Sequence, residues 1–174
     1  MASRCLFATL ATATLVMAAA GEGVLNMAFY MHDHLNRNKD QTAFPVAGVN
    51  GSSSEASKFG TLVVISDMVT KRPQITEYDT ENILGRAQGT YVNTNPVTGL
   101  DFLMVFSLIF QNAEYNGSTL EIQGTERFDQ PHREYAVVGG TGKLRFARGY
   151  AVGTTVSTSG ENAVLKINAT FCTV

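Results

Sequence analysis

Hydrophobic and polar residues alternate with a period of two along several stretches of the chain. Every second residue between 25 and 31 is large and apolar, and the same alternation recurs over 119–123 and 165–171. Such alternation is typical of β-strands with one buried face. Further strands are expected near 59–66, 84–92, 101–111, 134–138 and 143–153.

These strands predict an all-β domain, because no helix-period segment of useful length follows the first twenty residues. About eight antiparallel strands without a helical layer favour a closed β-barrel, which removes exposed sheet edges; a β-sandwich is the alternative. Residues 36–58 are rich in Asn, Gly, Ser and Lys and are expected to form a long loop. The run 101–111 is apolar on both faces, so its outer face is expected to meet another apolar surface such as a neighbouring subunit.

The first twenty residues have the pattern of a secretory signal peptide. Arg4 precedes an apolar run over 6–19, and the small residues 18–20 form a cleavage site. We therefore expect a cleaved signal peptide at 1–20 and one mature domain at 21–174. The apolar run is short for a membrane span, and the formal net charge of -2 without a basic cluster argues against a nucleic-acid partner.

Three glycosylation sequons agree with export. Their acceptor residues are Asn50, Asn116 and Asn168. Single sequons also arise by chance, so each is a weak signal by itself.

Two charged residues interrupt otherwise apolar stripes. Asp33 shares strand parity with the apolar residues of 25–31, and Arg148 shares parity with Leu144, Phe146 and Tyr150 if a strand covers 143–153. A lone buried charge is strongly unfavourable, so each needs a partner or a ligand. We therefore predict that Asp33 and Arg148 lie together in the barrel cavity, where they form either a catalytic pair or a structural salt bridge.

Three further residues are candidates for the cavity wall. Tyr91 offers a hydroxyl and a ring, and Phe171 offers an apolar wall near the C-terminus. Asp67 follows Val63 and Ile65 in alternation, so it either faces inward or begins a turn. His32 and His34 flank Asp33 on the opposite face, where surface or interface histidines are expected rather than a metal site.

Several motifs resemble the plant dirigent protein family, and together they cover nearly all of the expected mature chain. They occupy residues 29–33, 59–64, 85–91, 115–120, 133–142 and 147–151. The resemblance implies an eight-stranded antiparallel barrel, commonly a homotrimer, secreted to the plant cell wall or apoplast. It also implies that the positions of Asp33 and Arg148 belong to the family's pocket.

The resemblance further implies a role in phenylpropanoid (lignan- or lignin-like) metabolism and plant defence. Family members give stereocontrol to the coupling of phenoxy radicals, which an external laccase or peroxidase generates, or to the cyclisation of quinone methides. The partner would then be a small phenolic intermediate. We expect no cofactor, no metal and no oxidising centre in the chain itself.

Two positions depart from the lignan-forming members of the family. Lys143 stands where those members carry an acidic residue, which counts against lignan-type coupling of coniferyl alcohol and leaves the substrate open. The N-terminal cysteine that pairs near the C-terminus in those members is missing, so Cys172 is expected to be a free thiol.

Two classes of function follow from these observations. The first is a stereochemical guide or cyclase with an enclosed polar constellation; the second is a non-catalytic defence or wall-binding module that recognises glycans. An enclosed apolar pocket that contains the buried charges favours the first, and a filled barrel with an exposed aromatic groove favours the second.

Overall fold

The computed structural model describes residues 23–35, 39–51, 55–76 and 79–173. The signal peptide expected at 1–20 lies outside these residues. The strands are β1 (Val24–Asp33), β2 (Ala43–Ala47), β3 (Leu62–Thr70), β4 (Ile83–Asn93), β5 (Asp101–Phe110), β6 (Thr119–Arg127), β7 (Arg133–Gly140), β8 (Arg148–Ser159) and β9 (Asn162–Cys172). Three short 3-10 helices, η1 (Val49–Gly51), η2 (Thr80–Asn82) and η3 (Gly142–Leu144), lie in the connections.

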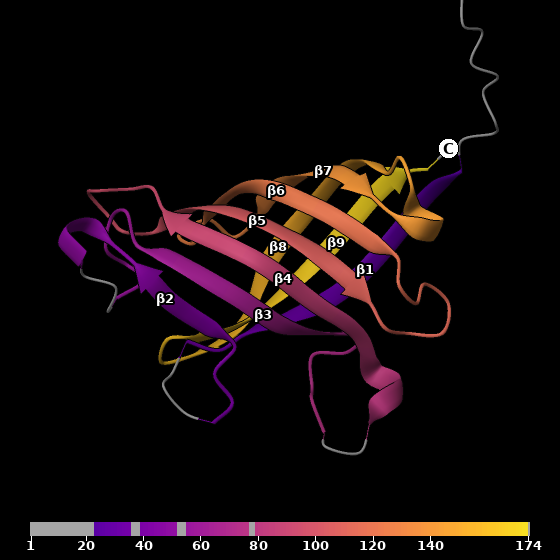
Figure 1. Cartoon of the computed structure of the whole chain (residues 1–174), viewed down its shortest axis with the longest axis horizontal. Helices are drawn as coiled ribbons and strands as arrows, with labels where there is room; N and C mark the ends of the chain where they lie inside the picture. The colour runs from indigo at the N-terminus through magenta and orange to yellow at the C-terminus, as the bar shows by residue number, and fades with distance from the viewer. Residues whose placement is uncertain (1–22, 36–38, 52–54, 77–78, 174) are drawn as a thin grey trace, which may run out of the picture.

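The sheet closes into an eight-stranded antiparallel barrel. Its strands follow the order β1-β9-β8-β7-β6-β5-β4-β3, and β1 also pairs with β3. Figure 1 shows β3 to β6 as the near wall, with β8, β9 and β1 behind them. The predicted all-β barrel is therefore confirmed. We call the β1–β3 pairing, in which His32 faces Met68 and Tyr30 faces Thr70, the closing seam.

The segment 36–58 contains more regular structure than the sequence predicted. Within its described residues it forms β2, which pairs with β3 outside the closed barrel, and the helix η1. This excursion lies between β1 and β3 in the chain. It therefore separates in sequence the two strands that the closing seam brings side by side.

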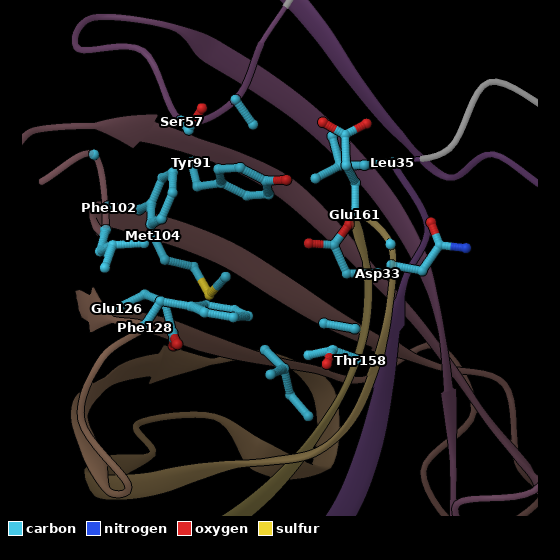
Figure 2. A pocket seen from close by; sticks show the side chains of 17 residues that line it. Asp33, Leu35, Ser57, Tyr91, Phe102, Met104, Glu126, Phe128, Thr158 and Glu161 are labelled. Carbon is cyan, nitrogen blue, oxygen red and sulfur yellow. The ribbon is translucent and has the colours of Figure 1, made fainter.

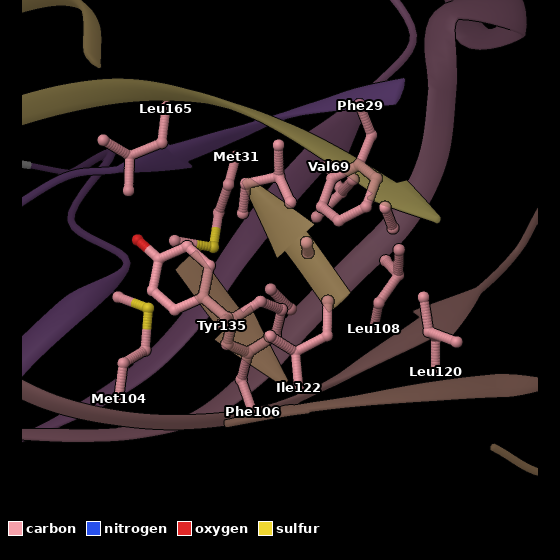
Figure 3. Close-up of a cluster of buried hydrophobic side chains, with 14 of the residues drawn as sticks. Phe29, Met31, Val69, Met104, Phe106, Leu108, Leu120, Ile122, Tyr135 and Leu165 are labelled. Atoms are coloured by element: carbon pink, nitrogen blue, oxygen red, sulfur yellow. The ribbon is translucent and has the colours of Figure 1, made fainter. Parts of the chain in front are cut away.

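Inward-facing side chains fill the end of the barrel that lies away from Asp33. Phe29, Leu108 and Leu120 are fully buried there, and Figure 3 shows side chains from both walls of the barrel meeting in this cluster. Burial of such side chains is the main favourable term in folding. This end of the molecule is therefore a packed core.

The strand expected at 143–153 begins later than predicted, and this changes which side chains face inward. Residues 142–144 form η3, Phe146 has a positive φ of 65°, and β8 begins only at Arg148. The left-handed residue breaks the period-two alternation. As a result Leu144 and Ala147 are buried, whereas Phe146 and Arg148 are exposed.

Candidate functional site

A cavity opens at one end of the barrel, which we call the mouth. It is bounded by the end of β1 and by the loops β2–β3, β4–β5, β6–β7 and β8–β9. These segments meet because successive strands are antiparallel, so every second connection lies at the same end. The cavity volume is about 210 Å³.

The wall of the mouth cavity is largely apolar. Tyr91, Phe102, Met104 and Leu165 contribute to it, as Figure 2 shows. The rings of Tyr91 and Phe102 meet edge to face, with centroids 5.5 Å apart and an interplanar angle of 82°. An aromatic, apolar wall with a few polar groups is the usual composition of a small-molecule site.

Asp33 is the acid at the inner side of this cavity. It is the last residue of β1, only 9% exposed, and lines the cavity. Burial raises the pKa of Asp33 to about 7, Tyr91 opposes that rise, and the charge of Glu126 adds to it. A carboxyl with a pKa near neutrality can both donate and accept a proton under mild conditions.

Asp67 lies behind Asp33 and does not line the cavity. It is fully buried on β3, so of the two interpretations the inward one describes its position. Thr42 Oγ1 donates a hydrogen bond of 2.6 Å to Asp67 Oδ1. Burial raises the pKa of Asp67 well above its usual value, and the neighbouring charge of Asp33 raises it further.

Tyr91 lies where the sequence placed it, with its ring in the cavity wall and its hydroxyl directed toward Asp33 (Figure 2). Burial and the nearby carboxyls of Asp33 and Asp67 raise the pKa of Tyr91 far above its usual range. Tyr91 is therefore a neutral phenol. The hydroxyl interacts with the carboxyl of Asp33 and has no further hydrogen-bond partner among the described residues, so a ligand oxygen can compete for it.

A buried ion pair forms a second polar centre at the cavity, because its acidic member, Glu126, also lines the cavity. Arg133 Nε lies 2.7 Å from Glu126 Oε1, and both side chains are almost completely buried. The hydroxyl of Tyr135 donates a hydrogen bond to Glu126 Oε2. Burial raises the pKa of Glu126 and Arg133 opposes that rise.

Sequence reasoning missed Glu126 and Arg133, although the signal was present. Glu126 continues the inward stripe of Leu120 and Ile122 on β6, and Arg133 shares parity with Tyr135 on β7. The predicted strands ended at 123 and began at 134, so neither residue was included. The rule that identified Asp33, a charge within an apolar stripe, applies equally to both.

The predicted meeting of Asp33 and Arg148 is wrong. Asp33 pairs with Ala163 and Arg148 pairs with Cys172, near opposite ends of β9. At about 3.3 Å per strand residue these ends are roughly 30 Å apart. Arg148 is also exposed, because the break at Phe146 reverses the parity on which the prediction rested.

Phe171, a predicted wall residue, and Lys143, the position that departs from the lignan-forming members, also lie away from the mouth cavity. Phe171 is buried in the packed core, where it pairs with Leu25 and Gly149. Lys143 is exposed in η3, and its Nζ donates a hydrogen bond of 2.7 Å to the carbonyl of Glu114. Neither residue lines the cavity.

The histidines beside Asp33 differ from the expectation of surface residues in one respect. His32 is 3% exposed, and its Nε2 lies 2.8 Å from Thr70 Oγ1. Burial, and secondarily the charge of His34, lowers the pKa of His32 to about 4. Over the described residues, no group of three or more His, Cys, Asp or Glu is arranged to hold a metal ion.

Other sequence expectations concern the outside of the barrel. The acceptors Asn50, Asn116 and Asn168 are all exposed. Cys172 is a free thiol and is half-buried. In the ranges that the structure describes, helices of the length and apolarity needed to cross a bilayer do not occur.

The raised pKa of Asp33 predicts a pH-dependent stability. Between about pH 4 and about pH 7 the folded chain retains a proton on Asp33 that the unfolded chain has lost. The Asp33 contribution to the free energy of unfolding therefore falls as pH rises through this window, by about 1.4 kcal/mol per unit of pKa difference, and is constant above it.

Urea denaturation of the wild type and of Asp33→Asn across this range measures the contribution of Asp33 together with its effect on Asp67. The comparison is necessary because His32, with a pKa lowered to about 4, contributes a slope of opposite sign between its unfolded and folded values. The wild type should lose stability relative to the variant as pH rises. Parallel curves for the two proteins would contradict the assignment of a raised pKa to Asp33.

The barrel and the mouth cavity define a small β-barrel protein with a partly enclosed acidic and aromatic site for a small molecule. The sequence profile of the family described as Dirigent-like protein matches residues 24–172. The chain belongs to the dirigent family.

Individual relatives agree with this assignment. Dirigent protein 11 of Arabidopsis thaliana is 37% identical over 140 residues, which cover 80% of this chain and 69% of the relative. Pterocarpan synthase 1 of Glycine max is 37% identical over 131 residues, covering 75% and 67% of the two chains. The solved structure of the pterocarpan synthase dirigent protein GePTS1 superposes with a TM-score of 0.78 at 31% identity, covering 91% of this chain and 89% of that one.

Proposed function

We propose that this dirigent protein binds a phenolic quinone methide in the mouth cavity and controls the stereochemistry of its ring closure. The observation that carries the proposal is the carboxyl of Asp33, buried in an aromatic cavity with its pKa raised to about 7. The similarity to two proteins named as pterocarpan synthases supports ring closure as the reaction class.

Asp33 would act as a proton donor and acceptor in this reaction. Its proton passes to the carbonyl oxygen of the quinone methide while a phenolic oxygen of the same molecule forms a C–O bond at the methide carbon. The exocyclic π electrons move into the ring, which becomes a phenol. The proton of the attacking hydroxyl passes to the carboxylate, so the product is an isomer of the substrate and no oxidant is consumed.

The cavity walls would supply the stereocontrol. Tyr91 and Phe102 form a rigid corner in which a planar ring can present one face to its nucleophile. Holding the two reacting atoms in a single geometry accelerates closure and selects one enantiomer. Tyr91 would also donate a hydrogen bond to a phenolic or methoxy oxygen of the ligand, in place of its interaction with Asp33.

The small cavity favours a reaction of one substrate molecule over the coupling of two, and a ring system larger than the cavity would extend out through the mouth. Drug-sized ligands occupy pockets of roughly 300–1,000 Å³, whereas this cavity measures about 210 Å³. Coupling would require two phenoxy radicals in the same space, together with a separate laccase or peroxidase that generates them.

Chiral product analysis tests the proposal. A quinone methide with an internal phenolic nucleophile should yield an excess of one enantiomer with the protein and a racemate without it. Arg148→Leu is a matched control and should keep the full enantiomeric excess, because Arg148 lies at the opposite end of the barrel.

A parallel reaction of coniferyl alcohol with laccase distinguishes the alternatives. An enantiomeric excess in radical coupling but not in ring closure would replace our proposal with the coupling reaction. Racemic products in both reactions would overturn stereocontrol and favour the non-catalytic wall-binding module.

The proposal also includes export to the apoplast and assembly of copies of the chain. The exposed positions of Asn50, Asn116 and Asn168 support glycosylation, because an acceptor must be accessible to be modified. Leu103 and Val105 are exposed on the outer face of β5, which supports an apolar contact between subunits of a homotrimer.

A further inference from the structure

Two carboxyls meet at the closing seam, one at the cavity and one behind it. The pairing of His32 with Met68 places the next residues, Asp33 on β1 and Asp67 on β3, side by side with both side chains facing inward. Asp33 lines the mouth cavity, whereas Asp67 does not. Asp67 can therefore influence a ligand only indirectly, through residues such as Asp33 and Tyr91 that line the cavity.

Each of these carboxyls leaves one oxygen unsatisfied. Among the described residues, neither Asp33 Oδ1 nor Asp67 Oδ2 has a hydrogen-bond partner, although Asp67 is fully buried. Two ionised carboxylates in adjacent inward positions would repel each other strongly when both are buried. A single proton held by the pair removes the repulsion and can supply the hydrogen bond that the unsatisfied oxygens lack.

A short chain of hydrogen bonds reaches the second oxygen of Asp67, Oδ1. The backbone N–H of His34 donates to Thr42 Oγ1 at 3.2 Å, and Thr42 Oγ1 in turn donates to Asp67 Oδ1 at 2.6 Å. This bond fixes the carboxyl plane and favours the ionised form of Asp67. The hydroxyl of Thr42 therefore opposes the effect of burial on the pair.

Other titratable groups also act on the pair. Glu126 of β6 acts on Asp33, and Arg86 of β4 acts on Asp67. Tyr91 of β4 is a neutral phenol beside both carboxyls, and Glu161 at the β8–β9 turn lies at the cavity mouth. Arg133 is engaged in its ion pair with Glu126.

We propose that Asp67 is a positioning residue that shares one proton with Asp33 across the closing seam. A pair of carboxyls with one proton can donate and accept a proton in the same reaction cycle, as in the aspartic-protease dyad. Ring closure needs both steps, so the role of the pair in catalysis rests on the proposed function. The shared proton itself does not.

Two isosteric variants test the shared proton with shifts of opposite sign. Asp67→Asn removes the like charge and should lower the pKa of Asp33 by about one unit or more. Thr42→Val removes the hydrogen bond that favours the ionised form of Asp67. This variant should therefore raise the pKa values with which the two carboxyls titrate. The measurement is carbon-13 NMR titration of the aspartate carboxyls in the full-length protein without ligand.

The ring-closure rate should decline at high pH as the pair loses its proton. The pH at which it declines should be lower in Asp67→Asn and higher in Thr42→Val than in the wild type. An unchanged Asp33 titration in folded Asp67→Asn, or shifts of the same sign in both variants, would overturn the shared proton. A third outcome is that the two carboxyls titrate as a coupled pair while the protein gives only racemic product. That result would support the shared proton and overturn the proposed function.

Discussion

Asp33→Asn is expected to slow enzyme-dependent ring closure by about 100- to 10,000-fold, which is the usual contribution of a positioned general acid or base. Asparagine keeps the shape of the side chain but carries no acidic proton for the carbonyl oxygen. The aromatic corner of Tyr91 and Phe102 remains in this variant. We therefore expect the rate to fall far more than the enantiomeric excess of the residual product, as measured by single-turnover kinetics and chiral chromatography.

Asp129→Asn provides the matched control. Asp129 lies in the β6–β7 connection at the same end of the barrel, but it is exposed and does not line the mouth cavity. The same chemical change there should leave the rate within twofold of the wild type, which is about 0.4 kcal/mol in the barrier. A folded Asp33→Asn protein with the wild-type rate would show that Asp33 does not transfer the proton.

Arg133→Met is expected to produce the largest loss of stability, about 3–5 kcal/mol at neutral pH. The change leaves Glu126 buried without its cation, and the hydrogen bonds of Arg133 to Thr155 and to the carbonyl of Gln130 are also lost. The cost should shrink at acidic pH, because protonated Glu126 carries no charge. Urea denaturation at neutral and at acidic pH measures both effects.

The double variant Glu126→Gln with Arg133→Met separates the lost ion pair from lost packing. Removal of both charges should recover most of the stability, because the cost comes mainly from an uncompensated buried charge. Arg145→Met, at an exposed arginine, should change stability by less than about 0.5 kcal/mol. If Arg133→Met were no more destabilising than Arg145→Met, the ion pair would not contribute to stability.

Local pattern was sufficient for much of the barrel and for part of the site. Alternation over 25–31 continues without a break to Asp33, so its inward direction followed from the sequence. For Asp67 the same alternation left an inward position and a turn open, and the structure decides for the inward position because β3 continues to Thr70. Alternation is a property of one strand and remains valid for as long as that strand continues.

The prediction for Arg148 is wrong because the expected strand over 143–153 is interrupted before it reaches Arg148. The segment between β7 and β8 contains η3 and the left-handed residue Phe146, and each interrupts the period of two. The apolar Leu144 and Phe146 imitate the pattern of a strand that does not exist at those positions. The backbone conformation of a single residue therefore moved Arg148 from the expected cavity to the outer surface.

The amino-acid sequence by itself determined the all-β class, most of the strands, the family resemblance and the inward direction of Asp33, and it left the direction of Asp67 open. The tertiary structure alone decided which of these groups meet. The closing seam joins β1 to β3 across the β2 excursion and so places Asp33 beside Asp67, whereas Arg148 is at the far end of the barrel. The physical reason is that side-chain direction depends on local backbone geometry, while proximity depends on strand register and on the closure of the sheet.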